Sequence, residues 1–210
     1  MTNQQERSSL STSAKLYAVA MLGFACNDII YWIFAGTNGL YFADYAFRLT
    51  ILLFLWAGRH SLPPLPKKRG SDGLVGLLFF VLVVFSMLCE PVSVKLGSGW
   101  ELFRWHPIGN MYLWFFDLTV GLMLVAVVEE LVSRRLAFAV LPGPMWVRWI
   151  VSSLLFGLMH WSMGYGHMVE TALIGLAFGA AYWWTGSLKL VIMAHYAVNF
   201  LIFGLGAGEL

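Results

Sequence analysis

Charged side chains interrupt an otherwise apolar stretch of the sequence, VVEELVSRRLAF, at residues 127–138. An ionisable group at membrane depth costs about 2.5–3.5 kcal/mol on insertion scales, so each one needs a partner or a function. Glu130 and Arg134 are four residues apart and can pair on one helix face. Glu129 is rotated by about 100° from Glu130 and has no local partner. Its carboxylate is therefore the candidate general base for activating a water molecule.

Two further segments carry histidines that would complete such a site. FGLMH places Phe156 and His160 on one helix face. HYAVN does the same for His195 and Asn199. Glu129 would take a proton from water, and His160 would orient that water or assist the proton transfer. His195 and Asn199 would donate hydrogen bonds to the oxyanion that forms when water attacks a peptide carbonyl. The pattern predicts peptide hydrolysis inside a membrane.

Structural roles are the alternative for several of these residues. A single intramembrane histidine often forms a hydrogen bond between helices, and Glu130 with Arg134 could be a supporting salt bridge without a direct catalytic role. Three other acidic residues lie in or near apolar segments, and we expect structural roles for Asp28, Asp117 and Glu170.

The composition identifies the environment of these groups. The chain has 210 residues, of which 60% are hydrophobic and 11% are charged, whereas soluble domains carry about 25% charged residues. We therefore predict an all-α, polytopic integral membrane protein, and the chain length and the three helices predicted before residue 110 favour the cytoplasmic (inner) membrane of a bacterium. Cys26 and Cys89 both fall in apolar segments, which indicates neither a disulfide framework nor a cysteine metal cluster.

About seven segments approach the roughly 20 apolar residues that a spanning helix needs. They lie near residues 15–35, 40–57, 73–94, 110–134, 146–163, 168–185 and 188–206. A cytoplasmic N-terminus puts ten of the 13 basic residues inside, as the positive-inside rule requires. These ten are Arg7, Lys15, Arg59, Lys67, Lys68, Arg69, Arg134, Arg135, Arg148 and Lys189; Arg48, Lys95 and Arg104 remain outside. The C-terminus is then predicted to be external.

The predicted helices form one integral membrane domain with two parts. Residues 1–109 supply three helices and a basic cytoplasmic loop at 58–72, which we interpret as a topological signal and not as a nucleic-acid site. Residues 110–210 supply a catalytic core of four helices. Gly175 and Gly179 form a GxxxG pair that predicts close helix packing there.

The three motifs together resemble those of the CAAX protease and bacteriocin-processing (CPBP or ABI) family, which includes the type II CAAX prenyl endopeptidases. The family pattern is EExxxR, FxxxH and HxxxN, and here it reads EELVSR, FGLMH and HYAVN over about residues 110–206. The resemblance implies an intramembrane endopeptidase in which Glu129 activates water with the help of His160. It implies that His195 and Asn199 stabilise the oxyanion, and that Glu130 and Arg134 are a supporting pair.

The sequence says less about the cofactor and the substrate than about the catalytic residues. Family members have been described both as metalloproteases and as metal-independent glutamate proteases. The absence of an HExxH motif and of cysteine ligands favours catalysis without a cofactor, with zinc as the alternative. Short loops favour a substrate delivered through the bilayer, either membrane-embedded or with a lipidated or hydrophobic tail. The oligomeric state is left open by the sequence.

Two other functions are compatible with the composition. A non-catalytic immunity or scaffold protein could retain the same fold, although every motif position is intact here. A proton-coupled carrier could use the intramembrane acids and histidines as a relay, but the sequence shows no paired repeats of the kind many carriers have.

Overall fold

The computed structural model describes residues 3–62, 70–97, 99–100, 102 and 108–204, with side chains from residue 11 onward. Within these ranges the chain forms helices and no strand. Several residues of the sequence predictions lie outside the described residues: Lys67, Lys68, Arg69, Arg104 and the end of the last predicted helix at 205–206.

The described helices form seven rods, as the apolar segments predict. Six of them are single α-helices: α1 (Asn3–Phe34), α2 (Gly39–Ala57), α3 (Asp72–Leu96), α7 (Met145–Leu158), α8 (Tyr165–Thr185) and α9 (Leu188–Asn199), the last extended by the π-helix η5 (Phe200–Gly204). The remaining rod, here named the central rod, covers residues 111–140. It joins α4 (Met111–Phe116), η2 (Asp117–Gly121), α5 (Leu122–Glu130), η3 (Leu131–Leu136) and α6 (Ala137–Val140) without a break.

Four helices are long and apolar enough to cross a bilayer. They are Ser11–Phe34, Gly39–Ala57, Asp72–Leu96 and Met111–Val140; Met145–Leu158 and Leu188–Gly204 are apolar but shorter. Large apolar side chains such as Leu22, Leu88 and Val94 are well exposed on the outside of the bundle, which suits a surface that faces lipid. The protein is an all-α polytopic membrane protein, as its composition predicts.

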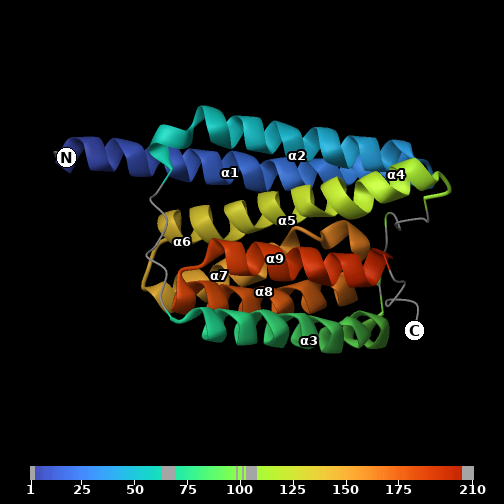
Figure 1. Ribbon diagram of the computed structural model, residues 1–210. Helices are drawn as coiled ribbons and strands as arrows, with labels where there is room; N and C mark the ends of the chain where they lie inside the picture. Colours follow the sequence, from blue (N-terminus) through green and yellow to red (C-terminus); the bar gives the residue numbers. More distant parts are fainter. Residues whose placement is uncertain (1–2, 63–69, 98, 101, 103–107, 205–210) are drawn as a thin grey trace.

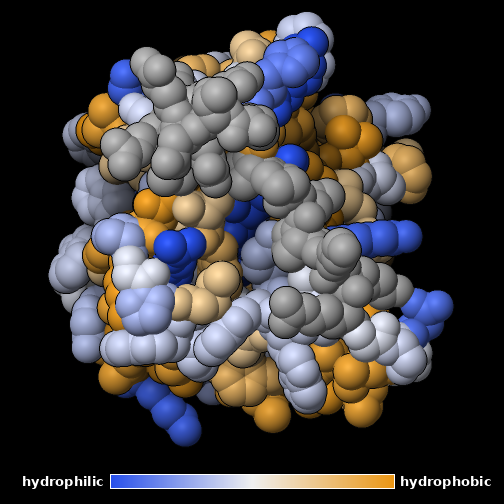
Figure 2. Space-filling view, turned by 90° about the vertical axis from the view of Figure 1, so that its left-hand side faces the viewer, coloured by the Kyte–Doolittle hydropathy of each residue, from blue (hydrophilic) through white to orange (hydrophobic). Residues whose placement is uncertain are grey.

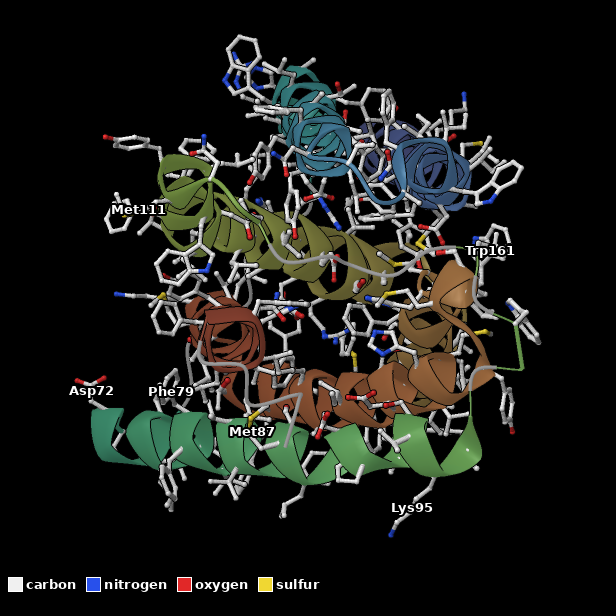
Figure 3. The ribbon with its side chains drawn as sticks, turned by 90° about the vertical axis from the view of Figure 1, so that its right-hand side faces the viewer. Asp72, Phe79, Met87, Lys95, Met111 and Trp161 are labelled. Atoms are coloured by element: carbon white, nitrogen blue, oxygen red, sulfur yellow. The ribbon has the colours of Figure 1, made fainter. Side chains whose placement is uncertain are left out.

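The central rod lies between two groups of helices (Figure 1). On one side α1 and α2 pack against each other, and α2 also contacts α5. On the other side α9 contacts α5, while α7, α8 and α3 follow, with α3 packed on α8 and α9. Phe79 and Met87 point from α3 toward these neighbours and Lys95 points away (Figure 3). The rod therefore faces both the N-terminal and the C-terminal helices.

Glycines bring α7 and α8 unusually close. A Cβ atom added to Gly157 would lie 2.5 Å from the Met168 carbonyl oxygen, and one added to Gly179 would lie 2.6 Å from Cδ1 of Trp149. A Cβ on Gly175 would lie 3.2 Å from the Phe156 ring. The GxxxG pair thus packs against α7, as predicted. This contact holds the helix that precedes His160 firmly in place.

A tight turn then reverses the chain from α8 into α9. Gly186 adopts a left-handed conformation with φ of 65°, which ends α8, and the Ser187 hydroxyl accepts a hydrogen bond from Leu190 N to begin α9. The two helices are consequently antiparallel neighbours, and His195 and Asn199 are carried back toward the centre of the bundle.

The start of α1 and the end of η5 lie at opposite ends of the bundle (Figure 1). Hydrophilic residues are scattered over the end at which α1 begins (Figure 2). This arrangement is compatible with a cytoplasmic N-terminus and an external C-terminus, which remain predictions.

The structure corrects three details of the sequence predictions. Arg48, which the predicted orientation counts among the external basic residues, is buried within α2 at 6% exposure, with Asp44 and Glu129 as its acidic partners. The helix predicted at 146–163 ends at Leu158, so His160 occupies the turn after α7. The helix predicted at 110–134 continues to residue 140, since the π-helical segments carry it past the charged residues.

Candidate active site

Two adjacent carboxylates at the end of α5 are the centre of the site. Glu129 and Glu130 are the last residues of α5, and the π-helix η3 follows them directly. Short π-helical segments inside α-helices occur frequently at functional sites. Because neighbouring helical residues differ by about 100° in direction, the two carboxylates have different surroundings, although both lie near His195 of α9. Both are almost completely buried.

Glu130 forms the predicted pair with Arg134 and a second contact that the sequence does not reveal. Arg134 Nε lies 3.1 Å from Glu130 Oε2, and both side chains are 0% exposed. The other carboxylate oxygen, Oε1, accepts a hydrogen bond from His195 Nδ1 at 3.0 Å. The Arg134 guanidinium also lies 5.0 Å from the centre of the Phe156 ring. Glu130 therefore connects its own helix to α9.

Glu129 has its two oxygens in different surroundings. Oε1 lies 2.7 Å from Arg48 Nη1 of α2. Oε2 is buried and accepts no hydrogen bond from the described part of the chain. It faces His160 Nε2 at 4.0 Å and His195 Nε2 at 3.8 Å. These separations leave Oε2 as the free acceptor of the site, as a general base requires.

The imidazole of His160 is oriented by the helix that precedes it. Its Nδ1 lies 2.9 Å from the Phe156 carbonyl oxygen. A carbonyl only accepts hydrogen bonds, so Nδ1 carries the proton, and Nε2 of the neutral ring presents a lone pair toward Glu129. The Phe156 and His160 rings are in edge contact with centres 5.2 Å apart. The four-residue relation read from the sequence holds although His160 lies just beyond α7.

Asn199 is the remaining residue of the predicted set. It is the last residue of α9, one turn beyond His195, and its side chain is half-buried. No hydrogen bond to its amide occurs within the described ranges. The structure thus brings Glu129, His160 and His195 together directly, and places Asn199 on the same helix as His195.

Sequence reasoning missed one contributor to the site, Arg48, and the pair that holds it. Arg48 Nε lies 2.9 Å from Asp44 Oδ1, and the Tyr31 hydroxyl donates a hydrogen bond to the same oxygen. The signal in the sequence was the four-residue spacing of Asp44 and Arg48 within the apolar segment of α2. That spacing predicts an intrahelical pair, but it does not predict that the cation also reaches Glu129.

Two of the acidic residues with expected structural roles have partners of their own. Asp117 accepts a hydrogen bond from the Tyr45 hydroxyl at 2.7 Å, which connects the central rod to α2. Glu170 Oε2 lies 3.3 Å from His167 Nδ1. Asp28 is buried in α1, and its Oδ2 accepts no hydrogen bond from the described residues. Asp117 is therefore buried in the same rod as Glu129 but takes part in a separate contact.

The donor groups around Glu129 Oε2 bear on whether the site fits a metal ion. One carboxylate oxygen and two imidazole nitrogens face one another, which is a donor set that zinc accepts. Across the described residues, however, no three His, Cys, Asp or Glu side chains are arranged so that they could hold a metal ion. The separations of 3.8 and 4.0 Å at Glu129 Oε2 can be bridged by a water molecule.

Comparison with known proteins gives a family match for the second half of the chain. Residues 109–201 match the family model described as Type II CAAX prenyl endopeptidase Rce1-like. No curated protein and no solved structure matches the chain. The matched segment contains all three motifs and covers the central rod, α7, α8 and most of α9 with its extension. The match confirms the family resemblance read from the motifs.

Proposed function

We propose that this chain, whose residues 109–201 belong to the Rce1-like family of type II CAAX prenyl endopeptidases, hydrolyses a peptide bond within the membrane by using Glu129 as the general base. The family is a protease family, so the coarse activity is peptide hydrolysis. The observation that carries the residue assignment is the buried, unpaired Glu129 Oε2 facing two imidazole Nε2 atoms. We assign a water molecule as the partner of this oxygen.

The water would donate its two hydrogen atoms to Glu129 Oε2 and His160 Nε2. This leaves a lone pair of the water oxygen directed at the scissile carbonyl carbon. Glu129 accepts one proton as the new C–O bond forms, and it then returns a proton to the nitrogen of the leaving amine as the C–N bond breaks. His160 keeps the water in line throughout, because its own ring is fixed at Nδ1 by the Phe156 carbonyl.

His195 and Asn199 would stabilise the negative oxygen of the tetrahedral intermediate. Asn199 has amide hydrogens to donate, and it lies one helical turn from His195. His195 already donates from Nδ1 to Glu130, so it donates from Nε2 only when both ring nitrogens carry a proton. Glu130 supports this arrangement because it holds the His195 imidazole at Nδ1, and Arg134 in turn pairs with Glu130. No step of the proposed reaction passes through a metal.

The substrate would be membrane-embedded or anchored by a lipidated or hydrophobic tail. The reacting groups lie among the helices of an integral membrane protein whose outer surface carries many exposed apolar side chains. A substrate segment therefore meets the site from within the bilayer more readily than from water. A peptide with a prenylated cysteine near its C-terminus is one such substrate, and an unmodified apolar tail is another. The proposed location is the cytoplasmic membrane of a bacterium.

The test compares cells that produce the wild-type protein with cells that produce Glu129→Gln. Membrane proteins are analysed for new peptide termini. We expect termini that depend on the wild-type protein and disappear in the variant. Asp117→Asn is the matched control, because it makes the same carboxylate-to-amide change at another buried position of the central rod. It should keep the wild-type termini. Identical termini in wild type and Glu129→Gln would instead support a non-catalytic immunity or scaffold protein.

A further inference from the structure

A buried cation from the N-terminal half of the chain contacts the proposed general base. Arg48 lies in α2, outside the segment that matches the protease family. Its Nη1 is 2.7 Å from Glu129 Oε1, and both side chains are under 8% exposed. Ion pairs so deeply buried are rarely a net gain in stability over apolar side chains of similar size. The position of this pair at the reacting group calls for a functional explanation.

Arg48 is itself fixed by other side chains of α1 and α2. Asp44 Oδ1 accepts a hydrogen bond from Arg48 Nε at 2.9 Å and another from the Tyr31 hydroxyl. The guanidinium carbon lies 5.1 Å from the centre of the Phe24 ring and 5.6 Å from that of Phe47. A guanidinium held by a carboxylate and flanked by rings has little freedom to turn. It can therefore act as a rigid anchor for a second carboxylate.

The anchor acts on one oxygen of Glu129 only. Oε1 forms an ion pair with Arg48, whereas Oε2 has no hydrogen bond and faces His160 and His195. A carboxylate without this partner would be free to rotate about its last bond and to pair both oxygens with the histidines. The contact with Arg48 thus decides which oxygen receives the proton and keeps that oxygen aimed at the water position.

We propose that Arg48 is a positioning residue for hydrolysis, which holds Glu129 through Oε1 so that Oε2 stays available as the base. The proposal rests on the proposed function, and it extends the site to α1 and α2 through the chain Tyr31, Asp44 and Arg48. Arg48 touches neither water nor substrate in this arrangement. Its loss therefore lowers the rate of the chemical step and leaves substrate binding nearly unchanged.

The test measures kcat and KM separately in purified variants. The probe is a quenched fluorescent peptide that carries the sequence around a terminus that depends on Glu129 in cells. Arg48→Gln should lower kcat by up to about 100-fold, the loss that a misplacement of about 1 Å at reacting groups can cause, with KM close to the wild-type value. Arg48→Lys should recover part of kcat, since lysine restores the charge without the planar, two-pronged geometry. Asp44→Asn, which loosens Arg48 without removing it, should cause a smaller loss.

Asp117→Asn is the control for a merely structural effect. It weakens another buried contact between α2 and the central rod, the hydrogen bond from Tyr45, and it does not touch Glu129. It should lower thermal stability while kcat stays at the wild-type level. If Arg48→Gln does not fold, Arg48→Lys and Asp44→Asn provide the comparison with this control.

The outcomes separate the two proposals. Suppose that Glu129→Gln is inactive. A wild-type kcat in Arg48→Gln would then overturn the positioning role. If Arg48→Gln does not fold, a wild-type kcat in both Arg48→Lys and Asp44→Asn would overturn it. A loss of kcat that follows thermal stability equally in the Arg48 and Asp117 variants would overturn it too, because packing alone would then explain the result. If no peptide terminus depends on Glu129, the proposed function fails first and the role of Arg48 fails with it.

Discussion

The Glu130 carboxylate binds His195 Nδ1 at 3.0 Å, across 65 residues of sequence. Its second oxygen lies 3.1 Å from Arg134 Nε, so one acidic side chain is shared by a cation of its own helix and an imidazole of α9. The ion pair and the histidine are therefore not independent parts of the site. Loss of either partner leaves Glu130 with a buried oxygen that has no ion-pair or hydrogen-bond partner.

Arg134→Ala should destabilise the protein strongly. Removing one member of a buried ion pair leaves the other charge without compensation, which costs about 3–5 kcal/mol. The thermal midpoint in detergent should fall, and the yield in membranes should fall with it. Arg59→Ala is the matched arginine control, because Arg59 is exposed and packs over the Trp56 ring, and its loss should cost about 1 kcal/mol or less. Equal stability of the two variants would contradict a supporting role for the Glu130–Arg134 pair.

His160→Ala should abolish most of the proteolysis and leave the fold intact. A positioned group that takes part in proton transfer contributes about a hundredfold to ten-thousandfold in rate, and His160 Nε2 faces the free oxygen of Glu129. The rate of appearance of Glu129-dependent termini is the measurement. His60→Ala, an exposed histidine in the short helix η1 (Arg59–Ser61), should behave as wild type. Normal proteolysis by the His160 variant would remove this residue from the site.

Gly157→Ala should weaken the contact between α7 and α8. The added methyl group meets the Met168 carbonyl oxygen, which belongs to the backbone and cannot move aside without shifting the helix. Overpacking of this kind typically costs about 1–3 kcal/mol. Gly76→Ala in α3 is the control, because a Cβ there meets nothing within 4 Å. That variant should be neutral or more stable by up to about 1 kcal/mol, since alanine favours the helix. Similar thermal midpoints for both variants would contradict the close packing.

Zinc chelation should leave the Glu129-dependent termini unchanged. In the proposed reaction Glu129 takes the proton and His160 accepts a hydrogen bond from the same water molecule, so no step requires a metal ion. The experiment treats cells with a membrane-permeant zinc chelator and compares their termini with those of untreated cells. Loss of the termini on chelation, with recovery on added zinc, would replace the water-only site by a metal site formed by Glu129, His160 and His195.

Local relations between residues could be read from the sequence alone. The apolar composition determined that the chain is a helical membrane protein, and helical periodicity determined that Glu130 pairs with Arg134 and that His160 lies over Phe156. The GxxxG pair correctly predicted a close helix contact. These features depend on spacings of about one helical turn, and such spacings are fixed wherever the helix forms. Order and spacing of the three motifs also sufficed to predict the family model that residues 109–201 match.

The tertiary structure alone decided which helix faces meet. Nothing in the spacing of residues 44, 48 and 129 indicates that α2 lies against α5, so Arg48 seemed to belong outside the membrane and Glu129 seemed to have no ion-pair partner. The bundle brings the two together at 2.7 Å and assigns separate surroundings to the two oxygens of one carboxylate. Packing between distant segments depends on the shapes and charges of several helices at once, and that information is distributed over the whole chain.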